Sequence, residues 1–133
     1  MEHGSSIEIN TEWDIVAARQ LGRNEAKETG FGTVDQARIT TAISELARNI
    51  YLYAGKGVIK IEPVRAGQRT GLIITASDEG PGITDLQKVM EDGFTTSGGL
   101  GAGMPGVKRL MDDFRVETEV GIGTTITATK WLH

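Results

Sequence analysis

The sequence predicts an α+β fold, a two-layer α/β sandwich in which a mostly antiparallel, mixed sheet carries its helices on one face. Segments in which every second residue is apolar occur in pairs joined by short turns, a pattern typical of antiparallel hairpins. Two longer segments repeat their apolar residues at helical spacing. In order, the elements read β-α-α-β-β-α-loop-α-β-β, so helices and strands can form separate layers. We expect residues 1–133 to form one domain.

A short strand and two helices account for the first half of the chain. Residues 6–10 alternate as a strand does, and helices are expected over residues 12–28 and 34–54, the second ending at Gly55. The candidate N-caps are Thr11 and Thr33. The apolar residues that give the helical spacing are Trp13, Val16, Ala17 and Leu21 in the first helix and Ile39, Ala42, Ile43, Leu46, Ile50 and Tyr53 in the second.

Strands and short helices follow one another in the second half. The expected elements are a hairpin of strands 58–64 and 70–78, a short helix over 83–90 capped by Thr84, a glycine-rich loop over about 92–103, a helix from about Met104, and a closing pair of strands at 113–120 and 124–131. Pro105 would then stand in the first turn of its helix, where proline is tolerated. The turn GIG joins the last two strands.

Composition excludes several function classes. The net charge is −4 and the basic residues are scattered, so the chain lacks the basic stripe of a nucleic-acid binder. Cysteine is absent and the histidines, His3 and His133, are terminal, which argues against disulfides and against thiolate or histidine metal sites. Neither an apolar run of about 20 residues nor a signal peptide is visible. We therefore expect a cytoplasmic protein that binds neither membranes nor nucleic acid.

One glycine-rich segment matches a dinucleotide-binding pattern. Residues 101–106, GAGMPG, fit G-x-G-x-x-G, which requires a strand before the first glycine and a helix after the last. The preceding EDGFTTSGG is polar and is no buried strand, and the two acidic residues at a ribose-like spacing, Glu117 and Glu119, precede a hairpin turn. The dinucleotide interpretation therefore fails on topology.

The same segment has the features of a loop that covers phosphate groups. Thr95, Thr96 and Ser97 enter it and a helix leaves it, so that hydroxyls, free backbone N–H groups and a helix N-terminus all favour an anion. The alternative is a surface loop without function. A phosphate-binding loop requires partners elsewhere in the chain.

Three other segments supply candidate partners. In SDEGPGI, Asp78 follows an apolar strand and could accept a hydrogen bond from the exocyclic amine of a base, with Gly80 and Gly82 leaving room for the ring; the alternative is an ordinary turn. In ISELARNIY, Glu45 and Asn49 share one helix face beside the apolar stripe. Asparagine oxygen suits Mg²⁺ and a glutamate can accept a hydroxyl proton, whereas the alternative is a solvated face.

A fourth segment, GIGTT, is at least a hairpin turn. Thr124 begins the strand after it and could offer its hydroxyl to a base or to a bridging water. Taken together and in this order, the segments ELARN, DEGPGI, GGLGAGM and GTT resemble the GHKL superfamily of Bergerat-fold ATP sites, in which they correspond to the N box, the two glycine boxes and the closing threonine motif. The resemblance spans about residues 44–125.

The resemblance implies a role for each matching position. Asp78 would bind the adenine amino group with help from Thr124, and Asn49 would coordinate Mg²⁺. Glu45 would be the catalytic base or would orient the acceptor hydroxyl. Glycines in two segments would border the nucleotide. These are Gly80 and Gly82 at the adenine, and Gly99, Gly101 and Gly103 with Thr95 in the phosphate lid.

Within the superfamily, the chain is similar to the small anti-sigma-factor kinases, and most of all to the stressosome switch kinases. That resemblance implies an ATP- and Mg²⁺-dependent serine/threonine kinase that phosphorylates STAS-domain antagonists and activates a PP2C-type phosphatase by binding it. The alternatives are an ATP-gated binding module that sequesters a partner such as a sigma factor, and an ATPase subunit. Residues 92–103 hold no basic side chain, unlike the lids of several such kinases, so we expect slow transfer.

Overall fold

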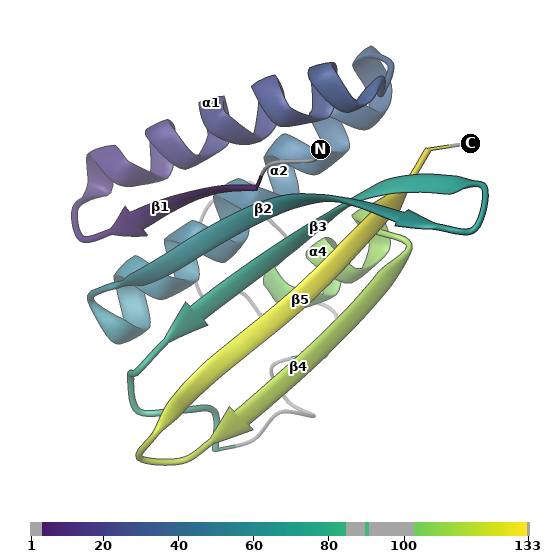
Figure 1. The fold of residues 1–133 in the computed structure, drawn as a ribbon. Helices are drawn as coiled ribbons and strands as arrows, with labels where there is room; N and C mark the ends of the chain where they lie inside the picture. Colours follow the sequence, from purple (N-terminus) through teal and green to yellow (C-terminus); the bar gives the residue numbers. More distant parts are fainter. Residues whose placement is uncertain (1–3, 85–89, 91–102, 133) are drawn as a thin grey trace.

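The computed structural model describes residues 4–84, 90 and 103–132 (Figure 1). Its strands are β1 Ser5–Ile9, β2 Gly57–Ala66, β3 Arg69–Asp78, β4 Asp113–Glu119 and β5 Gly123–Trp131, and its helices are α1 Glu12–Thr29, α2 Thr33–Asn49 and α4 Gly103–Leu110. A π-helical turn, Ile50–Ala54, continues α2. The helix expected over residues 83–90 lies mostly outside the described residues.

The strands form one sheet in the order β1-β2-β3-β5-β4. Every pairing among the described strands is antiparallel, so the predicted antiparallel character is confirmed and the mixed component is not seen. Figure 1 shows α1, α2 and α4 on one side of this sheet, which confirms the two-layer arrangement. The chain leaves β3 at the middle of the sheet and returns through α4 to the β4 edge, so that the end of β3 meets the start of β5.

Alternation along the strands separates a buried face from a polar one. The side chains that face the helices are fully or nearly fully buried, whereas Lys60, Thr75 and Thr127 are on the other face. The buried strand residues include Ile59, Ile61, Leu72, Ile74, Ile126 and Ala128. Against them lies the apolar stripe of α2, in which Ile39, Ile43 and Leu46 are at most 1% exposed. The predicted stripe of α2 is thus confirmed up to Ile50.

Tyr53 is the exception in that stripe, with 51% of its surface exposed. The helix widens after Asn49, and the N–H of Gly55 donates to the carbonyl oxygen of Ile50, five residues earlier. Each turn then takes more residues than an α-helix does, so Tyr53 turns away from the core. Gly55 ends the segment with a φ of 83°, which confirms its predicted position.

The buried face of α1 differs from the one expected from its larger apolar residues. Trp13 is 81% exposed and Val16 47%, and the face turned to the core consists mainly of small residues. Those buried residues are Ile15, Ala18, Gly22 and Ala26. A Cβ on Gly22 would overlap the side chain of Ile43, so glycine lets α1 approach α2 closely.

Two element boundaries also differ from the expected ones. The N-cap of α2 is Gly32, and Thr33 is already the first helical residue. The strands β2 and β3 continue to Ala66 and Arg69, so a two-residue turn joins them instead of the five polar residues 65–69. Gly67 has a φ of 63°, which a tight hairpin turn requires.

Lys130 is the charged side chain that joins three elements on the buried side of the sheet. It comes from β5, is 8% exposed, and places Nζ 3.4 Å from Asp112 and 3.9 Å from Asp35 at the start of α2. The other oxygen of Asp112 accepts the backbone N–H of Trp131 at 2.7 Å. Within the residues described, no helix is long and apolar enough to span a membrane.

Candidate functional site

The end of β3 brings two of the predicted site residues together. Asp78 is paired with Thr124 of β5 on one side and with Gly57 of β2 on the other. Its Oδ1 accepts the backbone N–H of Gly80 at 2.9 Å, which leaves Oδ2 for a ligand. Asp78 also lines a hollow of about 610 Å³ beside the π-helical turn, so the strand end is accessible.

A hydroxyl pair fixes Thr124. It is 7% exposed, and its Oγ1 lies 2.9 Å from Oγ1 of Thr118, the residue opposite it in β4. The Thr118 hydroxyl also accepts the N–H of Ile83 at 2.9 Å and lies 3.2 Å from the carbonyl oxygen of Gly123. Thr118 thus ties the segment after β3 to the start of β5. The sequence interpretation missed it, and its only signal was its place opposite Thr124 across the predicted turn.

The glycines around Asp78 are required by close packing. A Cβ on Gly80 would lie 2.7 Å from Cβ of Ala54, and one on Gly123, whose φ is 152°, would overlap the carbonyl oxygen of Asp78. Gly82 has a φ of 78° and lies against the end of β4. A side chain at any of these positions would push the turn away from its neighbours. The turn interpretation therefore explains these glycines in part, whether or not a ring lies against them.

The end of α2 reaches the same end of the sheet. A Cβ on Gly57 would lie 2.7 Å from Cγ2 of Ile50 and 3.2 Å from Cβ of Asp78, so the residue after Asn49 packs beside Asp78. Glu45 lies one helical turn before Asn49 on the same face. The structure thus brings Ile50, the residue after Asn49, beside Asp78; Glu45 lies one turn before Asn49 along α2.

The environment of Glu45 is unusual for a carboxylate. It is 6% exposed, and its Oε2 has no hydrogen-bond partner among the described residues. Burial raises the pKa of this carboxyl, and the nearby charge of Arg48 partly opposes the rise. Glutamates are rarely buried without a partner, and a raised pKa makes the carboxylate a stronger base. Glu45 is therefore a buried carboxylate that takes up a proton more readily than an exposed one does.

The remaining predicted residues belong to the glycine-rich segment. Gly103 is buried, has a φ of 67° and begins α4, so the loop ends where it was expected to end. Thr95, Gly99 and Gly101 lie outside the described residues. Lys108, the basic residue nearest the loop on α4, is exposed. In the described part of the chain, no three acidic, cysteine or histidine side chains form a metal-binding group.

Comparison with known sequences identifies a family for this chain. The family model described as histidine kinase-, DNA gyrase B-, and HSP90-like ATPase matches residues 34–133. The chain is 71% identical over all 133 residues, and over 100% of the relative's length, to the serine/threonine-protein kinase RsbT of Bacillus subtilis (strain 168). It is 36% identical over 102 residues to the anti-sigma F factor of Thermoanaerobacter sp. (strain X514), covering 72% of this chain and 70% of that one.

Solved structures share the fold at low sequence identity. The structure of the RsbU and RsbW domains of Rv1364c from Mycobacterium tuberculosis aligns with 95% of this chain and 32% of its own, with a TM-score of 0.60 and 20% identity. The nucleotide-free catalytic domain of the histidine kinase ThkA aligns over 96% and 97% of the two chains, with a TM-score of 0.54 and 18% identity. These likenesses concern the fold alone.

Substitution of Gly123 by alanine tests the packing at the end of β3. Gly123→Ala should lower the free energy of unfolding by about 2–5 kcal/mol, because it combines an unfavourable φ with overlap of the Asp78 carbonyl. Gly121→Ala is the matched control: its φ is 83° but no atom lies within 4 Å of the added Cβ, so about 1–2 kcal/mol is expected. Urea unfolding measures both, and equal losses would contradict the close contact.

Substitution of Glu45 by glutamine tests the buried carboxylate. Because its pKa is raised in the folded protein, the folded state binds more protons than the unfolded one between the two pKa values, and stability falls as pH rises through them. Glu45→Gln should therefore raise the melting temperature at pH 8, and the gain should disappear on acidification. Calorimetric scans of the wild type and the variant check this, with exposed Glu28→Gln as control. A gain that persists unchanged at low pH would contradict the assignment.

Proposed function

The chain belongs to the histidine kinase-, DNA gyrase B-, and HSP90-like ATPase family, and on this premise we propose that it is an ATP-dependent serine/threonine protein kinase of a partner-switching stress pathway. The observation that carries the proposal is the 71% identity, over its full length, to a serine/threonine-protein kinase. The order of residues along the chain supports the proposal as well. A buried glutamate, an asparagine and an aspartate at a strand end follow one another as the resemblance to this family implies.

Nucleotide binding is assigned to the end of the sheet. Asp78 accepts a hydrogen bond from the adenine amino group through Oδ2, because Oδ1 is engaged with Gly80. Thr124, oriented by Thr118, adds its hydroxyl to the same edge of the base. Gly80 and Gly82 border the ring. The phosphate lid consists of Thr95, Gly99, Gly101 and Gly103.

Asn49 is the residue we assign to Mg²⁺. Its amide oxygen is a hard ligand, and Mg²⁺ in phosphoryl-transfer sites is held by one or two protein ligands together with substrate phosphates and water. A single asparagine at the end of α2 fits this requirement without an acidic cluster. When bound, the ion neutralises phosphate charge.

Glu45 is assigned the role of catalytic base. The acceptor hydroxyl oxygen forms a bond to the γ-phosphorus while the bond from that phosphorus to the β–γ bridging oxygen breaks and ADP leaves. The hydroxyl proton passes to the carboxylate of Glu45, whose raised pKa favours proton uptake. Since residues 92–103 contain no basic side chain, less positive charge opposes the phosphates, and slow transfer is expected.

The partners we propose are STAS-domain antagonist proteins as acceptors and a PP2C-type phosphatase that the chain activates by binding, in the cytoplasm. A second candidate function is an ATP-gated binding module that sequesters a sigma factor. The 36% identity to an anti-sigma F factor supports this second candidate. The two functions differ in whether the chemistry of Glu45 is needed for the effect on the partner.

The decisive experiment incubates the protein with labelled Mg-ATP and candidate STAS-domain proteins and maps the phosphorylated residue. Glu45→Ala should lower kcat by about 10²–10⁴-fold, because general-base catalysis is lost, while calorimetry shows that Mg-ATP still binds. Glu28→Ala on the exposed face of α1 is the control. Full kinase activity in Glu45→Ala would refute the assignment of the base. A variant that cannot transfer phosphate but still regulates its partner would favour the binding module.

Asp78→Asn separates nucleotide binding from transfer. The amide presents hydrogen-bond donors where the adenine amine also donates, so loss of a charged hydrogen bond should raise the Kd for ATP about 10- to 100-fold. Isothermal titration measures the affinity, and Asp113→Asn at the opposite end of the sheet serves as control. An unchanged Kd for ATP in Asp78→Asn would show that the adenine ring binds somewhere other than at Asp78.

A further inference from the structure

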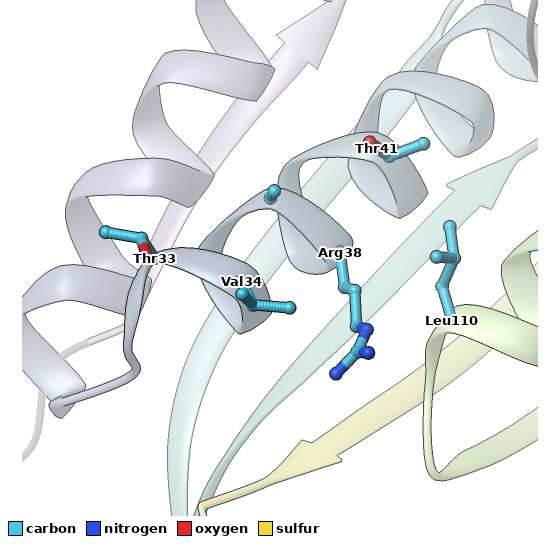
Figure 2. A pocket seen from close by; sticks show the side chains of 6 residues that line it. Thr33, Val34, Arg38, Thr41 and Leu110 are labelled. Carbon is cyan, nitrogen blue, oxygen red and sulfur yellow. The ribbon is translucent and has the colours of Figure 1, made fainter.

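A groove runs between the first half of α2 and the end of α4. Its volume is about 460 Å³. Figure 2 shows Thr33, Val34, Arg38 and Thr41 on α2 beside Leu110 of α4. Val34 is 62% exposed, and Ala37 and Thr41 are exposed as well, so the apolar lining is open to a partner.

The groove lies on the same face of α2 as Glu45. Arg38, Thr41 and Glu45 stand at spacings of three and four residues, which places them in one row along the helix. At 1.5 Å per residue, Arg38 precedes Glu45 by about 10 Å along the axis. Beyond Glu45 the row continues to Asn49 and the end of the sheet. The groove therefore lies along the same row of α2 as the candidate catalytic residue.

Three buried polar atoms on α2, at Glu45 and at a residue on either side of it, have no hydrogen-bond partner among the described residues. They are Ser44 Oγ, Glu45 Oε2 and Arg48 Nε. Buried polar atoms without partners are costly, so such a group calls for a ligand that supplies them. The groove itself needs an apolar occupant, whereas this stretch needs a polar one.

Arg38 gives the groove wall a positive charge. Its guanidinium is held 2.8 Å from Asp35 by one nitrogen, and its side chain is 49% exposed. A guanidinium carries five N–H groups, so donors remain for a carboxylate or backbone carbonyl of a bound segment. The occupant is thus apolar with an acidic or carbonyl neighbour.

Resting on the kinase function above, we propose that this groove docks the protein that is phosphorylated. An apolar side chain of the acceptor protein enters between Val34 and Leu110, and the chain continues along α2 so that its serine or threonine hydroxyl reaches Glu45. Val34 precedes Glu45 by about 16 Å along the helix axis, which equals about five residues of extended chain. The acceptor should therefore carry an apolar residue about five residues from its phosphorylated hydroxyl.

The exposed apolar face of α1 is not on this path. Trp13 and Val16 are exposed, whereas α1 turns its Gly22 side toward α2. The α1 face therefore points away from Glu45. It provides matched controls, because it carries an exposed valine and an exposed alanine like those of the groove.

A kinetic comparison tests the groove. The probe is a STAS-domain protein that the wild type phosphorylates. Val34→Glu should raise the KM for this acceptor about tenfold, while kcat and the Kd for Mg-ATP should remain unchanged. The same change on α1, Val16→Glu, should leave all three unchanged. Equal KM values for Val34→Glu and the wild type would overturn the docking proposal alone. Failure of the wild type to phosphorylate any STAS-domain protein would overturn the proposed function and docking with it.

Cross-linking gives an independent readout, because the chain has no cysteine of its own. A photoreactive maleimide on Ala37→Cys should cross-link the acceptor within the segment that contains the phosphorylated residue. The same label on Ala17→Cys, on the exposed face of α1, should not. Cross-links from position 17 but not from position 37 would overturn the proposal.

Discussion

The structure depends on how closely three backbone segments meet at the end of β3. Asp78 has glycine as its partner in β2, and in β5 the residue next to its partner Thr124 is also glycine. Neither Gly57 nor Gly123 has room for a Cβ, so the strands and the residue after Asn49 approach without intervening side chains. This narrow strand end lets the end of α2, at Ile50, pack directly beside Asp78.

The second constraint is the cost of keeping Glu45 buried. The helix α2 is held on its other sides by fully buried residues such as Ile39 and Ile43, which leaves the carboxylate little freedom to reach water. Glu45 Oε2, like Ser44 Oγ and Arg48 Nε, has no hydrogen-bond partner among the described residues, and such local violations of core packing rules cluster at functional sites. The core around α2 supplies the stability that offsets it.

The sequence predicts those features that depend on local periodicity and turn chemistry. The strands and the stripe of α2 follow from apolar spacing, and Glu45 and Asn49 are neighbours because a helix makes them so. In α1 two rows of residues both satisfy helical spacing, and the row containing Gly22 is buried because small residues allow close packing; periodicity cannot choose between them. The roles of Thr118 and Lys130 depend on strand register and on tertiary contacts, which cannot be predicted from the identity of a single residue.

The family match begins at Val34, where α2 and its groove begin, and includes every residue of the candidate site. The strand β1 and helix α1 lie outside it, and α1 supports α2 through Gly22. A fold shared with histidine kinases at about 18% identity cannot by itself specify the acceptor. Specificity must then come from exposed positions. One rigid helix carries both Val34, in the proposed docking groove, and Glu45, the proposed catalytic base, three turns later. The helix therefore fixes the distance between these two sites, which a loop would not do.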